Sequence, residues 1–392
     1  MTAAALSLAP VQRPILTVAV IAAMGLLGYV FGLSARQAAL LLIGIALGVS
    51  LYHASFGFTG AYRRVIVHRD MSGITAQFLM LAAVMLLFAP ILAQGKAFGH
   101  DVVGALAPVG VSVAFGAFIF GIGMQIASGC ASGTLFSAGG GSPRMVLVLV
   151  FFCAGAFWGS LDLHWWSRLP SLGGVSLSRV LGWEIALPMQ LGALFLIYLG
   201  LRLAGARNQR PVWWEHGFRW ENALRGPWPL LLSAGLLALL NWAVLLVAGH
   251  PWSINWGFSL WAAKVAAALG WDPASSPFWD DGYALAALSR PLLADDVSVT
   301  NIGILLGAFF AASLAGKVSP KPFATTPRSL AAIVVGGLLM GYGARLAYGC
   351  NIGSFFSGVA SASLHAWLWI ACAIPGNIIG VRLRPLFGQS ND

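Results

Sequence analysis

Apolar stretches long enough to cross a lipid bilayer recur along this chain, with short polar segments between them. A further apolar stretch, residues 252–268, carries three tryptophans together with Asn255 and Lys264, and we predict that it is a re-entrant or interfacial helix. The pattern predicts an all-α polytopic membrane protein. The ten predicted spans are 15–33, 37–58, 74–93, 102–124, 145–160, 186–204, 228–249, 301–316, 329–346 and 366–384.

The positions of lysine and arginine favour ten crossings over eleven, because basic residues collect in cytoplasmic loops. If 252–268 does not cross, the four basic clusters and both termini lie on the cytoplasmic side. We therefore expect a first membrane half (1–200), a basic cytoplasmic linker (201–227) and a second membrane half (228–392). The four clusters are Arg63, Arg64 and Arg69; Arg202, Arg207, Arg210, Arg219 and Arg225; Lys317, Lys321 and Arg328; and Arg382 and Arg384.

Composition supports the membrane assignment and narrows the partners. The chain is 59% hydrophobic and 9% charged, with a mean hydropathy of +0.83, whereas soluble domains carry roughly 25% charged residues. The net charge of +10 would suggest nucleic acid in a soluble chain. Here topology and contact with anionic membrane lipid explain it, so no nucleic-acid partner is expected. Four scattered cysteines without a CxxC pair favour neither a disulfide scaffold nor a zinc site, and no cofactor is predicted.

A fourteen-residue motif at 121–134 recurs at 341–354, with four glycines, a cysteine and a final hydroxyl in register at an offset of 220 residues. In the predicted topology the first copy is entered from the cytoplasmic side and the second from the outer side. The halves are therefore predicted to be an inverted repeat with central re-entrant glycine–cysteine loops. Interrupted segments at matching positions of inverted halves typically mark a transport site.

The motifs also supply the candidate chemistry. A thiol is a soft, weakly hydrogen-bonding group, and amides exposed on a glycine turn favour an anion. Arg345 occupies the position of Gln125 in the other copy, and an intramembrane arginine is a functional candidate. The plainer alternatives are glycine packing, a snorkelling arginine and hydroxyls bonded to helix carbonyls. The candidate substrate-path residues are Cys130, Cys350, Gly129, Gly349, Gly133, Gly353, Thr134, Ser354, Ser132, Asn351, Arg345, Gln125, His53 and Gly57.

His53 and Gly57 belong to an upstream element at 52–60 whose Gly-Phe-Thr is matched by Gly-Phe-Ser at 257–259. If this shorter match is real, two further turns point inward, one from each half.

The paired G-x-G-x5-G-C-x2-G-[ST] motifs, with SFGFTGAYR and WSINWGFSLW, resemble those of the YeeE/YedE family of bacterial inner-membrane proteins. The resemblance implies an hourglass of helices with central loops, uptake of thiosulfate, and cysteines that pass the ion by contact with its terminal sulfur. It also implies a small cytoplasmic sulfur-carrier partner of the TusA type. The thiosulfate-transporting pattern has a third cysteine where alignment places Gly57, so this chain lacks that thiol.

Three classes of function remain open from sequence. The first is uptake of a small sulfur-containing anion, thiosulfate before other sulfur or selenium species, which would make the protein a transporter and not an enzyme. The second is a membrane thiol oxidoreductase or sulfurtransferase, although such enzymes usually present CxxC or a disulfide pair. The third is a scaffolding membrane protein in which the glycines serve packing alone.

Overall fold

The computed structural model describes residues 10–214, 217–280, 282–318 and 325–391; Lys321 and two residues of the predicted linker lie outside them. The chain is almost entirely helical. The helices are α1 (Arg13–Leu33), α2 (Ala35–Ala54), α3 (Phe58–His68), α4 (Ser72–Gln94), α5 (Val111–Ala127), α6 (Ala131–Gly139), α7 (Pro143–Trp166), α8 (Leu177–Leu181), α9 (Trp183–Leu203), α10 (Trp220–Arg225), α11 (Leu230–Ala248), α12 (Asn255–Ala268), α13 (Gly282–Ser289), α14 (Asp296–Leu314), α15 (Pro327–Leu346), η3 (Asn351–Phe356), α16 (Ser357–Ala360) and α17 (Leu364–Leu383).

Ten helical stretches of the described residues are long and apolar enough to cross a membrane, and each overlaps one predicted span. Three of these stretches contain a break or an irregular turn: α2 with α3, α5 with α6, and α15 with η3 and α16. Helix α12 has only 14 residues, too few to span about 30 Å of hydrocarbon. The all-α membrane architecture with ten candidate spans is thus confirmed.

The predicted span 102–124 begins too early. Its first residues are extended, and strand β3 (Pro108–Gly110) pairs antiparallel with β4 (Ser171–Gly174) before α5 starts at Val111. Pro108 has no amide hydrogen for a helix interior, which favours the extended form. A second small ribbon pairs β1 (Lys96–Ala97) with β2 (His100–Asp101). Apolar composition alone does not distinguish these residues from a helix.

Helix contacts follow a two-fold pattern that relates the two halves. Helix α5 packs on α17 as α15 packs on α7, and α2 packs on α14 as α11 packs on α4. The pairs α5·α15 and α2·α11 lie on the axis that relates the halves. Helices α5 and α15 are antiparallel, since Gly116 lies against Gly343 and Gly123 against Gly336. The repeat is therefore inverted, as the motif offset predicted.

Glycines at the axis let backbones touch. A Cβ at Gly343 would lie 2.5 Å from the carbonyl oxygen of Gly116, and one at Gly341 would lie 2.1 Å from that of Phe152. Such distances exclude any side chain, so the GxG pairs of the motif serve close packing. Close packing, the plainer interpretation of these glycines, therefore fits the contacts of the described residues.

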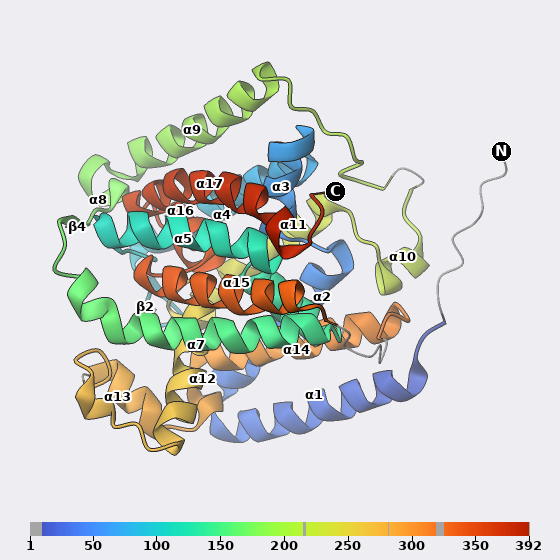
Figure 1. Cartoon of the computed structure of the whole chain (residues 1–392), viewed down its shortest axis with the longest axis horizontal. Coiled ribbons are helices and arrows are strands. Elements are labelled where there is room, and N and C mark those ends of the chain that lie inside the picture. Colours follow the sequence, from blue (N-terminus) through green and yellow to red (C-terminus); the bar gives the residue numbers. More distant parts are fainter. Residues whose placement is uncertain (1–9, 215–216, 281, 319–324, 392) are drawn as a thin grey trace.

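Figure 1 shows how the bundle is arranged. The long helices run across the view, with β2, β4 and α13 at one end and α10 and the C-terminus at the other. Helices α1 and α9 lie at the periphery, with few buried residues in each. The cysteine motifs lie inside the repeated core, between the two ends.

Candidate functional site

Cys130 sits at a sharp break between two helices. Helix α5 ends at Ser128 in the left-handed conformation (φ 65°), and Cys130 then caps α6 with an extended backbone. Its sulfur accepts a hydrogen bond from the Gly133 amide at 3.4 Å and lies 3.4 Å from the Ser132 hydroxyl. The thiol thus occupies an N-cap position, where free amides face the incoming group.

Cys350 repeats this geometry in the other half. Helix α15 ends before Tyr348, which is left-handed (φ 58°), and Cys350 caps η3 with an extended backbone. The following segment is a π-helix, whereas α6 is an ordinary α-helix. Ser354 donates to the Ala347 carbonyl at 2.7 Å, so this hydroxyl is bonded to backbone. The equivalent hydroxyl of Thr134 is buried without a partner among the described residues.

The glycines beside the cysteines have distinct surroundings. A Cβ at Gly129 would lie 3.2 Å from the Thr134 hydroxyl, and one at Gly349 would lie 2.8 Å from the Ser354 amide. Gly353 faces Ser253 of the segment before α12. Both turns are therefore closed tightly by a hydroxyl residue that follows the cysteine by four positions.

The two turns meet in the interior. Cys130 is 1% exposed and Cys350 is fully buried, and both belong to one core cluster. Helix α6 contacts η3 directly. The Asn351 amide lies 3.4 Å from the Tyr62 hydroxyl of α3, which joins the second turn to the first half. The predicted convergence of two buried thiol-bearing turns is thus present.

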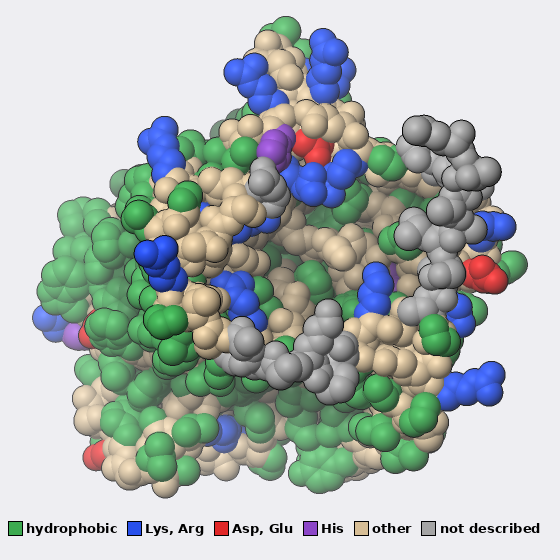
Figure 2. Space-filling view, turned by 45° about the vertical axis from the view of Figure 1, so that its right-hand side comes forward, with side chains coloured by type: hydrophobic (Ala, Val, Ile, Leu, Met, Phe, Trp, Pro, Cys, Tyr) green, Lys and Arg blue, Asp and Glu red, His purple; other side chains and the backbone are tan. Residues whose placement is uncertain are grey.

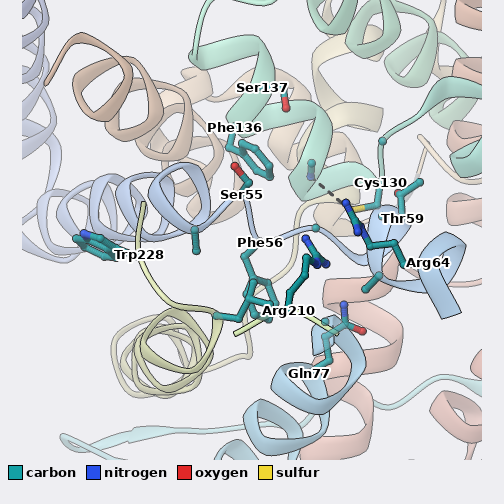
Figure 3. A pocket seen from close by; sticks show the side chains of 18 of the residues that line it. Ser55, Phe56, Thr59, Arg64, Gln77, Cys130, Phe136, Ser137, Arg210 and Trp228 are labelled. Carbon is teal, nitrogen blue, oxygen red and sulfur yellow. Dashed lines mark hydrogen bonds between the residues drawn. The ribbon is translucent and has the colours of Figure 1, made fainter. Parts of the chain in front are cut away.

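A cavity of about 430 Å³ leads to the first turn. Figure 3 shows the side chains of Arg64 and Arg210 extending into the same cavity as Cys130, with Phe56 and Gln77 beside them. Gly57 also lines it, so the upstream turn and the first cysteine turn face one space. We call this space the Cys130 cavity. Two guanidinium groups, a thiol and a capped helix start make it suited to a small oxyanion with a soft end.

Asp70 holds the two arginines in place. Its carboxylate accepts hydrogen bonds from Arg210 Nε at 3.0 Å and from the Ser72 hydroxyl at 2.6 Å, and Arg64 lies 3.6 Å away. The Gln209 amide also donates to it, which ties the linker after α9 to the turn between α3 and α4. Burial alone would raise the pKa of Asp70, but these hydrogen bonds outweigh burial and lower the pKa to about 2.

The mouth of the Cys130 cavity lies on a basic face. Figure 2 shows lysine and arginine side chains around a hollow in the end of the molecule that carries α10 and the C-terminus. Arg64 and Arg210 come from two of the predicted basic clusters, and Arg384 of the last cluster donates to the Gln125 carbonyl at the end of α5. At least one member of each of these three clusters thus lies at this end.

Three other predicted site residues lie outside this cavity. Gln125 is fully buried and donates to the Thr59 carbonyl and to Asn377, so it joins helices. His53 is buried against Trp228 and lines a neighbouring cavity with Lys317. Arg345 faces a third cavity at the other end of the bundle.

Sequence reasoning did not single out Arg64, Gln77, Asp70 or Arg210 as site residues. In the sequence, the basic residues of the loops indicate topology and contact with anionic lipid, not a site. Arg64 lies seven positions, about two helical turns, after Gly57. In a helix that starts at Gly57, Arg64 would therefore lie on the same face as Gly57. Among the residues that the structure describes, no three His, Cys, Asp or Glu side chains are grouped as a metal site would require.

The chain is similar in sequence to known and probable transporters. The chain is 27% identical over 353 residues to the thiosulfate transporter TsuA of Spirochaeta thermophila, covering 86% of this chain and 96% of that protein. It is 23% identical to the thiosulfate transporter TsuA of Escherichia coli, over 86% and 91% of the two chains. It is 29% identical to the probable transporter YedE of Escherichia coli, over 45% of this chain and 42% of that one.

The sequence pattern of the family described as Sulphur transport matches residues 53–379. This range includes both cysteine motifs and the upstream turn at Gly57. The chain belongs to the Sulphur transport family.

Proposed function

We propose that this protein takes up a small sulfur-containing anion, thiosulfate before other sulfur or selenium species, across the membrane. One observation carries the proposal: a buried thiol, a helix start and two arginines share the Cys130 cavity, and a second thiol-bearing turn meets the first from the other half. The thiosulfate specificity of the relatives that span most of this chain supports the choice of substrate.

The arginines and the thiols are suited to different ends of the thiosulfate ion. Guanidinium groups bind oxyanions with charge-assisted hydrogen bonds, so Arg64 and Arg210 attract the sulfonate end. The thiol of Cys130 is a soft, weak donor suited to the terminal sulfur. Cys350, at the equivalent position of the other half, offers the next soft contact along the path. Thr134, whose hydroxyl is buried without a partner among the described residues, supplies a further donor.

The orientation follows from the basic face. Lysine and arginine face the cytoplasm in membrane proteins, so the Cys130 cavity opens to the cytoplasm, with both termini on that side of a bacterial inner membrane. Each half of the chain, 1–200 and 228–392, contributes one glycine–cysteine turn, and the linker 201–227 lies between them on the cytoplasmic side. The ion then enters at the opposite face and leaves through the Cys130 cavity.

A sulfur-carrier partner of the TusA type would receive the ion at this exit. The basic surface around the mouth fits a partner with an acidic docking face. The family resemblance motivates this part of the proposal, and the position of the cavity mouth is compatible with it.

The absence of a CxxC pair does not favour the oxidoreductase alternative. Cys130 and Cys350 lie 220 residues apart in the sequence, each at the start of its own helical segment. Transport without covalent chemistry requires only contact.

The test is radiolabelled thiosulfate uptake into cells that lack their own uptake system. Cys130→Ala and Cys350→Ala are each expected to abolish uptake while the protein stays in the membrane at the wild-type amount. Cys153→Ala and Cys372→Ala are matched controls, since these cysteines lie in α7 and α17, outside both turns. Normal uptake by both turn variants would refute the proposal. Competition by selenite or sulfite that exceeds that by thiosulfate would reassign the substrate.

A further inference from the structure

A second cavity, of about 480 Å³, lies at the end of the molecule opposite the Cys130 cavity. Helix α7 runs between the two ends of the molecule. Its first turn borders the cavity that contains His53, next to the Cys130 cavity. Leu163 in its last turn and Ser167 just after it border the second cavity. The remaining lining comes from His164, Trp256, Pro277, Phe278, Tyr283, Ala284, Arg345 and Tyr348. Tyr348 is two residues before Cys350, so this cavity adjoins the second cysteine turn.

Arg345 repeats a position of the other half with a changed charge. Its repeat partner, Gln125, donates its side-chain amide to the Thr59 carbonyl and to Asn377, and only its Oε1 lacks a partner among the described residues. The guanidinium of Arg345 has a buried Nε without a partner among the described residues, and no carboxylate of these residues pairs with it. The neighbours of that guanidinium are rings: Phe278 at 4.1 Å and Trp256 at 5.8 Å from ring centroid to the central carbon.

These contacts leave hydrogen-bonding capacity unused. Ring faces attract a cation, but they offer no conventional acceptor for the five N–H donors of a guanidinium. An arginine at membrane depth is costly unless it has a partner, and charged groups retained there usually serve a ligand. An oxyanion that enters the cavity would supply both the acceptor and the compensating charge.

The walls of this cavity come from an insertion that the first half lacks. Between α3 and α4 only three residues intervene, whereas α12 and α14 are separated by residues 269–295. This insertion supplies Phe278 and Tyr283 to the lining. The second cavity thus has one arginine among aromatic rings, with His164 also in its lining, and the Cys130 cavity has two exposed arginines.

We propose that the second cavity is an anion-binding site, in which Arg345 holds a sulfur oxyanion at the face opposite the Cys130 cavity before the ion reaches the Cys350 turn. The passage to Cys350 rests on the proposed transport function, whereas anion binding by Arg345 does not. The ligand class is a divalent oxyanion small enough to lie between the guanidinium and Tyr348.

The first experiment measures how uptake depends on thiosulfate concentration. A charge-assisted hydrogen bond to a buried ligand corresponds to about tenfold or more in affinity, so Arg345→Gln is expected to raise the half-saturating concentration by about that factor. Arg345→Lys keeps the charge and is expected to recover part of the loss. Arg179→Gln is the matched control, because Arg179 is an exposed arginine of α8 at the same end of the molecule and lies outside this cavity; it is expected to behave as wild type. An unchanged half-saturating concentration in Arg345→Gln would overturn the proposal.

The second experiment needs no transport. In purified full-length protein carrying Tyr348→Cys together with Cys130→Ala, we compare the modification rate at position 348 by a disulfonate maleimide with that by the neutral N-ethylmaleimide, read by mass spectrometry. If Arg345 attracts anions, adding Arg345→Gln lowers the anionic-to-neutral rate ratio severalfold, and adding Arg179→Gln does not. A ratio that Arg345→Gln leaves unchanged overturns the anion site. If instead Cys130→Ala transports normally while the ratio falls, the transport function fails and the anion site stands.

Discussion

The two glycine–cysteine turns share a backbone but not an environment. Each follows a left-handed residue, Ser128 or Tyr348, and each places its cysteine at a helix start. Cys130, however, lines an open cavity with two arginines, whereas Cys350 is fully buried and lines none of the cavities described above. The second turn continues as a π-helix, a form that occurs frequently at functional sites.

The difference shows that the inverted repeat fixes the positions of the two cysteine turns but not the charged residues around them. Register fixes where each thiol lies, but the charges around it come from segments outside the motif: the turn at Asp70 and the linker in one half, and the insertion 269–295 in the other. The two ends of the proposed path therefore differ in their charged residues, even though the two cysteine turns at its centre are nearly symmetric.

The largest difference is expected in thiol reactivity. Because Cys130 lines an open cavity and Cys350 lines none of the cavities described above, a soluble maleimide should modify Cys130 at least about tenfold faster than Cys350 in purified protein. The rates are read by mass spectrometry in Cys350→Ala and Cys130→Ala, which each leave one of the two thiols. Equal rates would show that the second turn is as accessible as the first.

A smaller effect is expected from Asp70→Asn. Losing the carboxylate frees Arg64 and Arg210 from their shared partner, so the half-saturating thiosulfate concentration should rise severalfold while the protein remains folded. Glu221→Gln, at an exposed carboxylate of α10 on the same face, is the control. A wild-type uptake curve for Asp70→Asn would show that Arg64 and Arg210 do not need this carboxylate to act on the ion.

The pH dependence of the same contact has a definite sign. The pKa of Asp70 is lowered from 3.8 to about 2, so the contact stabilises the fold fully above pH 3.8 and is lost as the pH falls toward 2. The thermal unfolding difference between wild type and Asp70→Asn should therefore be constant from pH 5 to 8 and shrink below pH 4. A difference that changes near pH 7 would indicate another group.

The smallest effect is expected from Gly57→Cys, which places a third thiol in the Cys130 cavity. The nearest atom to a Cβ at Gly57 is 4.0 Å away, and its φ of −130° suits any residue. The variant should reach the membrane at the wild-type amount and lower the half-saturating thiosulfate concentration by about twofold, since a thiol is a weak donor. Gly57→Ser, of nearly the same size, is the control and should not show the decrease. Loss of Gly57→Cys from the membrane would mean that the turn requires glycine.

The spans and the repeat could be predicted because both depend on local sequence. Apolar length fixes where a helix crosses, and the recurrence of Gly-Cys at one offset marks equivalent turns. The short match at 57–59 and 257–259 also predicts corresponding places: α3 packs on α17 and α12 packs on α7, and α7 and α17 follow the cysteine turns of their own halves.

The surroundings of the site could not be predicted in the same way. Asp70 and Arg210 are 140 residues apart and meet because the linker returns to the turn before α4. Nothing local distinguishes Arg210 from the other basic residues of its loop. Likewise Gln125 and Arg345 are equivalent by register, but only the folded chain shows that one is bonded by protein and the other faces a cavity.

The backbone contacts at the axis bear on how turnover proceeds. Where Gly116 meets Gly343, and Gly341 meets Phe152, carbonyl groups abut without intervening side chains. Surfaces fitted so closely lose many dispersion contacts on even a small sliding step. We therefore expect the two halves to stay fixed relative to each other while an ion passes. Any conformational change that passage requires would then occur in the short segments after each cysteine.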